Sequence, residues 1–89
     1  MLTLQDRTHI ERIARQYDVR RILLFGSTVD REDHARDIDL AVEGLAPSRF
    51  FSFYGELIFS LSKPVDLVDL SHKSKFTEII RREGLPIYG

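Results

Sequence analysis

A short apolar run that ends in a Gly-Ser pair constrains this chain more than any other stretch. Residues 19–25 predict a strand, and its continuously apolar part, residues 22–25, indicates that it is covered on both faces or placed centrally in a sheet. Gly26-Ser27 breaks the run, and residues 28–35 predict a short helix or helical turn. A second strand is predicted at 37–42. The fold must therefore contain a strand, a tight turn that opens a helix, and another strand.

Side chains along the second predicted strand divide into an apolar and an acidic set. Because successive residues of a strand point to opposite faces, one face carries Ile38, Leu40 and Val42, and the other carries Asp37, Asp39 and Ala41. We expect the apolar set to pack against helices and the acidic set to lie on a more open side. The two carboxylates then lie about 6.5–7 Å apart along one face.

A third carboxylate, Asp66, lies in the third predicted strand, residues 65–70. It joins Asp37 and Asp39 on one side of the sheet if Val65 and Leu67 share the covered face with the apolar set of the second strand. Oxygen ligands of this kind suit hard cations such as Mg²⁺, and three acids on one face repel one another unless a cation neutralises them. A purely structural alternative for Asp37 is that it caps the strand. That alternative is weaker for Asp39, because Asp is depleted inside strands.

Gly26-Ser27 supplies a candidate anion site beside these acids. Glycine lets the backbone approach a phosphate closely, and the N-terminus of the following helix would attract an anion. A Gly-Ser pair after a strand is weak evidence alone. The two acidic residues on the next predicted strand strengthen the evidence for a phosphate site.

Helices are predicted at 3–17, 48–61 and 75–83, and residues 87–88 predict a short edge strand. Thr3 caps the first helix, with Asp6 as the partner of an approximate capping box. Its inward residues follow helical spacing: Ile10, Ile13, Ala14 and Tyr17. For the last helix we expect Phe76, Ile79 and Ile80 inward and Arg81-Arg82 as a solvated end. The order of elements predicts an α/β or α+β fold with a small central sheet.

The helix at 48–61 is the most apolar one. A buried stripe is predicted at helical spacing: Phe50, Phe53, Tyr54, Leu57, Ile58 and Leu61. Phe51 lies at its edge, and Gly55 predicts close packing. Phe59 lies opposite the stripe, so we expect a partner or a second copy of the chain to cover it. The alternative is a single exposed aromatic residue, which is common on protein surfaces.

Length and composition exclude several classes of protein. Eighty-nine residues make one domain, 1–89, and a domain this small gains from association with a partner. The net charge of −1 argues against a dedicated nucleic-acid binder. No stretch is long and apolar enough for a membrane span, and no apolar signal core or cysteine is present. We expect a soluble cytoplasmic protein.

Three stretches together resemble the nucleotidyltransferase superfamily that includes DNA polymerase beta: Gly26-Ser27, Asp37-Ile38-Asp39-Leu40 and Val65-Asp66-Leu67-Val68. The resemblance extends over nearly the whole chain. It is strongest to the minimal nucleotidyltransferase (MNT) branch, whose ending is similar to residues 76–88.

This resemblance implies a small mixed sheet backed by helices. Asp37 and Asp39 would bind two Mg²⁺ ions that carry the triphosphate, Asp66 would help to activate the attacking hydroxyl, and Gly26 and Ser27 would hold the β- and γ-phosphates. The implied reaction transfers a nucleotide monophosphate, commonly AMP from ATP, to a hydroxyl. MNT proteins commonly act as antitoxins of a helical HEPN toxin, a ribonuclease, in some cases by adding AMP to a tyrosine.

The segment between the Gly-Ser pair and Asp37 departs from the family pattern. It has nine residues, Thr28–Arg36, where relatives usually have ten, and it lacks a basic residue that Arg31 or Arg36 would have to replace. Intact carboxylates favour an enzyme that modifies its toxin, whereas the altered segment favours an antitoxin that neutralises by binding alone. A small-molecule nucleotidyltransferase of the aminoglycoside type would need dimerisation to form an acceptor pocket.

Overall fold

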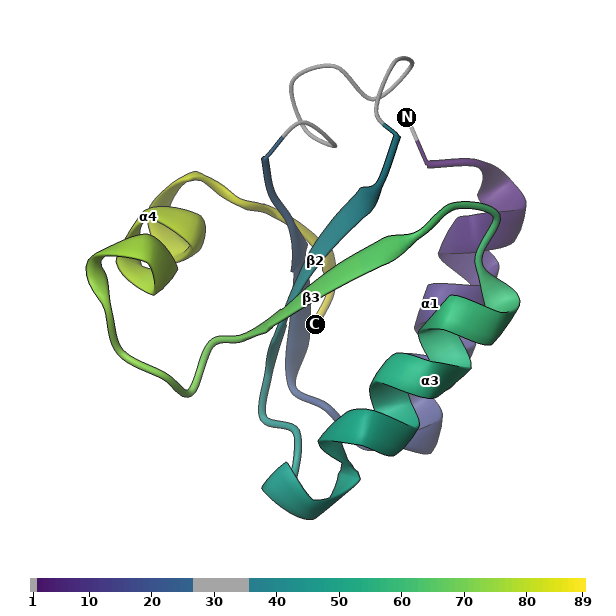
Figure 1. The fold of residues 1–89 in the computed structure, drawn as a ribbon, viewed down its shortest axis with the longest axis horizontal. Coiled ribbons are helices and arrows are strands. Elements are labelled where there is room, and N and C mark those ends of the chain that lie inside the picture. The colour runs from purple at the N-terminus through teal and green to yellow at the C-terminus, as the bar shows by residue number, and fades with distance from the viewer. Residues whose placement is uncertain (1, 27–35) are drawn as a thin grey trace.

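A four-stranded sheet with helices on both faces forms the protein (Figure 1). The structure is a computed structural model that describes residues 2–26 and 36–89. In chain order its elements are α1 (Leu4–Gln16), β1 (Arg21–Leu24), β2 (Ile38–Glu43), a 3-10 helix η1 (Pro47–Arg49), α3 (Phe50–Ser60), β3 (Val65–Asp69), α4 (Lys75–Glu83) and β4 (Leu85–Tyr88). The predicted helix at 28–35 and Ser27 lie outside the described residues.

The strands are ordered β3-β2-β1-β4 and form a mixed sheet. β2 runs parallel to β3, and β1 runs antiparallel to both β2 and β4. The apolar run of β1 therefore occupies a central strand, and Ile22, Leu23 and Leu24 are buried, as predicted. The α+β class, the small mixed sheet and the edge strand at the C-terminal end are confirmed.

Helices α1 and α3 lie side by side on one face of the sheet, and α4 lies on the other (Figure 1). The larger core fills the space under α1 and α3 and includes Ile38, Leu40 and Val42 of β2. A smaller cluster lies under α4 and consists of Leu23, Ala41, Leu70 and Ile80, with Phe25 and Val68 packed against it. The predicted alternation along β2 and β3 is thus confirmed, and the acidic side of β2 is the α4 face.

Helix α1 buries the predicted face, with Ile10, Ile13 and Ala14 fully inside. Thr3 caps it by accepting a hydrogen bond of 3.0 Å from the Asp6 backbone N–H. The capping-box role predicted for the Asp6 side chain is wrong. That carboxylate is buried and accepts from both the backbone N–H (3.0 Å) and the hydroxyl of Ser62, so it ties the start of α1 to the loop between α3 and β3.

Helix α3 buries a narrower stripe than the sequence predicts. Phe53, Leu57 and Leu61 are buried, but Ile58 is 56% exposed because it lies at the margin of the face that meets the sheet and α1. A Cβ added at Gly55 would have no atom within 4 Å, so the predicted close packing at this glycine is wrong within this chain. Phe59 is 89% exposed.

Helix α4 begins and ends where predicted, but only part of its predicted inward face is buried. Thr77 and Ile80 are buried, whereas Phe76 is 54% and Ile79 45% exposed, and these two apolar side chains border a hollow instead of filling the core. Arg82 is exposed, as predicted for a solvated end. Arg81 is also exposed, but it pairs with Glu43 of β2 and donates to the Leu70 carbonyl at 2.6 Å. No helix among the described residues is long and apolar enough to cross a membrane.

Candidate active site

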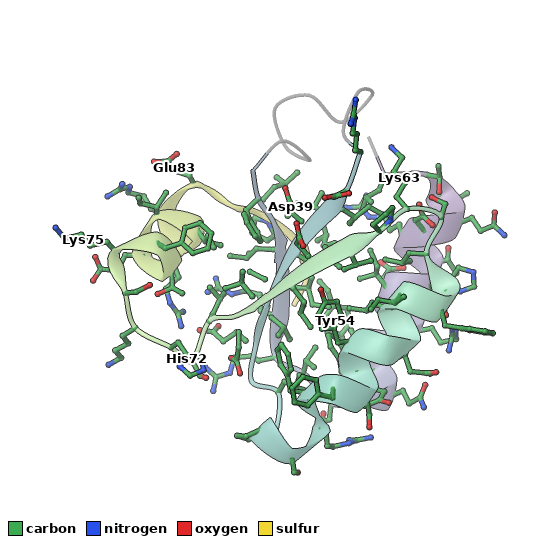
Figure 2. The ribbon with its side chains drawn as sticks, in the orientation of Figure 1. Asp39, Tyr54, Lys63, His72, Lys75 and Glu83 are labelled. Carbon is green, nitrogen blue, oxygen red and sulfur yellow. The ribbon has the colours of Figure 1, made fainter. Side chains whose placement is uncertain are left out.

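Two of the predicted site carboxylates lie next to each other on neighbouring strands. In the parallel pairing of β2 with β3, Asp39 is the partner of Asp66. Paired residues point to the same face, and adjacent strands lie about 4.8 Å apart. Asp39 is half-buried and Asp66 is exposed, and the register places both on the α4 face of the sheet; Figure 2 shows Asp39 on β2.

The turn after β1 lies directly against Asp39. Gly26 has a left-handed backbone conformation, with φ +63°, and a Cβ added to it would lie 2.7 Å from the Asp39 Oδ2 atom. The Phe25 N–H donates to the Asp39 carbonyl at 3.1 Å and fixes this approach. Glycine is required here on two counts, because side chains disfavour the backbone angle and the carboxylate occupies the space.

Asp37 immediately precedes β2 and is half-buried. The Ile38 N–H donates to the Pro64 carbonyl at 2.8 Å, so the beginnings of β2 and β3 lie side by side. Lys63, just before this contact, lies at the same end of the sheet as Asp39 (Figure 2). Arg36, a candidate replacement for the family's basic residue, is exposed.

The carboxylate oxygens of the paired strands are ligands of the kind that a hard cation binds. Asp39 and Asp66 offer carboxylate oxygens, which Mg²⁺ prefers along with water and phosphate oxygens, and a cation would relieve the repulsion between them. Within 2–26 and 36–89, no group of three or more His, Cys, Asp or Glu side chains is placed to hold an ion. The three-carboxylate site and the phosphate contact of Ser27 therefore stay predictions.

A hollow that the sequence did not indicate opens beside the Gly26 turn. It has a volume of about 230 Å³ and lies between the end of β1 and α4. Phe25 and Phe76 meet in it edge to face, with ring centroids 5.8 Å apart. The only sequence signal was the apolar first turn of α4, which helical periodicity assigned to the core.

An ion-pair network anchors α4 to the sheet that carries the carboxylates. Glu43 accepts from Arg81 and lies 3.2 Å from the Arg21 Nη2 atom. The hydrogen bond from Arg81 is the main cause that lowers the pKa of Glu43, helped by the charge of Arg21 and opposed by burial. Glu43 therefore stays ionised and keeps α4 in place.

Paired strand carboxylates beside a glycine turn are the arrangement that the resemblance to nucleotidyltransferases predicts. The chain belongs to the family "Polymerase beta, Nucleotidyltransferase", whose sequence profile matches residues 8–89. A search of curated protein sequences finds no match.

Solved structures of toxin–antitoxin proteins are similar to this chain. One, a toxin–antitoxin with AMP-PNP, has a TM-score of 0.75 and 28% identity over 93% of this chain and 73% of its own. Another, the toxin–antitoxin MntA-HepT, has a TM-score of 0.70 and 26% identity over 94% of this chain and 70% of its own. A protein from Shewanella oneidensis has the same fold, with a TM-score of 0.71 at 21% identity over 98% of this chain and 72% of its own. These likenesses confirm the nucleotidyltransferase fold.

Proposed function

We propose that this protein is a Mg²⁺-dependent nucleotidyltransferase that moves AMP from ATP to a hydroxyl of a partner protein, and that it thereby acts as the antitoxin of a HEPN toxin. The observation that carries the proposal is the pairing of Asp39 with Asp66 beside the Gly26 turn. Family membership supports the reaction class. The similar structure with AMP-PNP supports an adenine nucleotide as donor.

Each residue has a role set by its place on the sheet. Gly26 presents bare backbone to the phosphates, with Ser27 following it. Asp39, and Asp37 before it, hold the donor end of the site on β2. Asp66, one strand further from the turn, accepts the proton of the acceptor hydroxyl. The oxygen of that hydroxyl then bonds to the α-phosphorus. The bond from this phosphorus to the bridging oxygen of the β-phosphate breaks, and pyrophosphate leaves with the electron pair.

Asp37, Asp39 and Asp66 are the residues that would hold Mg²⁺. When bound, the ions neutralise charge on the phosphates and align the attacking and leaving oxygens. The carboxylates also orient the site without the ions, because β-sheet pairing fixes the backbone of Asp39 and Asp66.

The partner proposal draws on the similar toxin–antitoxin structures and on the outer side of α3. Phe59 and Ile58 are neighbours on that side and remain exposed. An exposed apolar surface on a small domain commonly marks an interaction site. We therefore place part of the toxin contact there.

A second candidate function is neutralisation by binding alone. The nine-residue segment Thr28–Arg36 favours it, as does the lack of a three-carboxylate cluster among the residues that the structure describes. In that case the α3 surface would be essential and the carboxylates would not.

One experiment separates the two functions. The protein is incubated with labelled ATP, Mg²⁺ and the protein encoded by the neighbouring gene, and toxin activity of that protein is measured in parallel. Label transfer that Asp39→Asn abolishes supports the enzyme. No transfer, with neutralisation retained by the Asp37→Asn/Asp39→Asn double variant, establishes the binding protein.

A further inference from the structure

The hollow beside the Gly26 turn adjoins the candidate active site at Gly26. Phe25, which lines it, lies in the same row across the sheet as Asp39 and Asp66, because its N–H bonds to the Asp39 carbonyl. Gly26 lines the hollow and also meets the Asp39 carboxylate. Among the described residues, Gly26 is thus shared by the hollow and the carboxylate side of the site.

The lining is apolar and aromatic on all sides but one. Phe25 and Phe76 form one wall, Ile79 lies beside them, and Ile80 is buried below. Of the described residues that line the hollow, Glu83 is the one with a polar side chain. A triphosphate cannot occupy this space, because the apolar walls cannot replace its water and Glu83 would repel it.

The size and chemistry fit one flat aromatic ring system. At about 230 Å³ the hollow is smaller than the roughly 300–1,000 Å³ of pockets that enclose a whole drug-sized ligand. Nucleobases stack on aromatic side chains, and carboxylates accept hydrogen bonds from amino groups of bases. Phe76, the more exposed of the two perpendicular rings, offers the stacking surface, and Glu83 at the rim offers the acceptor.

The strand order indicates which substrate enters this hollow. Asp39 on β2 lies between the hollow, which adjoins β1, and Asp66 on β3. The acceptor hydroxyl approaches from the Asp66 side in the proposed reaction. The base of the donor nucleotide is therefore the group on the opposite side.

We propose that the hollow between β1 and α4 binds the purine base of the donor nucleotide, stacked on Phe76. This inference rests on the proposed function for the placement of the phosphates. It assigns to α4 a role in selecting the nucleotide, beyond covering the sheet. Phe76 and Ile79 are exposed in this structure because their partner is the ligand.

Calorimetric titration tests the proposal on the whole protein with three Mg²⁺-loaded probes: ATP, CTP and inorganic tripolyphosphate. Phe76→Ala should weaken ATP binding about 5- to 100-fold, the equivalent of one stacked base, and leave tripolyphosphate binding unchanged. Wild-type protein should bind ATP more tightly than CTP. Phe51→Ala, which removes another exposed ring from the other face of the sheet, should match wild type with every probe.

Ile79→Ser is the second variant and should weaken ATP binding selectively as well. Circular dichroism verifies that each variant is folded. The proposal is overturned if Phe76→Ala and Ile79→Ser bind ATP within twofold of wild type, or lose ATP and tripolyphosphate affinity equally. Selective loss of ATP affinity in a protein that transfers no label would support the base site and reject the proposed enzyme. Full ATP affinity of Phe76→Ala together with active transfer would do the reverse.

Discussion

Gly26 and Gly55 form a matched pair for Gly→Ala substitution, with opposite expected effects on stability. Gly26 has a left-handed backbone angle, and its added Cβ would lie 2.7 Å from the Asp39 Oδ2 atom. Gly55 lies inside α3, and its added Cβ would meet nothing within 4 Å. The same methyl group is thus strained at one position and unhindered at the other.

The magnitudes follow from these environments. A non-glycine residue in the left-handed region costs roughly 1–2 kcal/mol, and displacement of the Asp39 carboxylate adds to that cost in Gly26→Ala. Alanine in place of glycine inside a helix gains up to about 1 kcal/mol, so Gly55→Ala should be stabilised. For a domain of this size 1 kcal/mol shifts the melting temperature by about 4–8 °C, so the two variants should differ by roughly 10 °C.

Urea and thermal unfolding followed by circular dichroism measure both changes. Binding of Mg²⁺-loaded tripolyphosphate provides a second readout, which Gly26→Ala should lose and Gly55→Ala should keep. Equal melting temperatures of the two variants, or unchanged tripolyphosphate binding by Gly26→Ala, would refute the close approach of the turn to Asp39.

Three further substitutions test other parts of the structure. Asp6→Ala should lower the free energy of unfolding by about 1–3 kcal/mol in urea titrations, because the Ser62 N–H loses its acceptor; a loss below 0.5 kcal/mol would contradict that role. The lowered pKa of Glu43 means that its stabilising effect is present above the unfolded value of 4.5 and is lost as pH falls through the lower folded value. Glu43→Gln should therefore remove stability at pH 7 and change it little near pH 2, as thermal melts across pH will measure; equal losses at both pH values would argue against the ion pair with Arg81. Phe59→Ser should leave the free energy of unfolding nearly unchanged and weaken toxin binding at least tenfold in pull-down titrations, and unaltered binding would remove Phe59 from the interface.

Local pattern alone was sufficient for much of the fold. The apolar run of β1 predicted a central strand, and alternation along β2 placed Ile38, Leu40 and Val42 under the helices. These predictions succeeded because each depends on how neighbouring residues in one segment divide between two faces.

Long-range relations were beyond the sequence. Alternation gave Asp66 the correct face, but its position beside Asp39 depends on the parallel pairing of β2 with β3, which no local pattern encodes. Asp6 and Ser62 are 56 residues apart, so their hydrogen bonds were equally hidden. Phe76 was assigned to the core because periodicity detects an apolar face and does not show whether the rest of the chain covers it.

The proposed transfer reaction requires Asp39 and Asp66 to act as one site. Transfer of label from ATP to the co-purified toxin, measured for Asp39→Asn, Asp66→Asn and Asp69→Asn, tests this most directly. Asp69 ends the same strand as Asp66, and asparagine keeps the acceptor for its 2.9 Å hydrogen bond from the Ser71 N–H, so this variant is the control. We expect at least a hundredfold loss of transfer for the first two variants and wild-type transfer for the third. Transfer that survives in Asp39→Asn or Asp66→Asn, or falls equally in all three variants, would contradict the account.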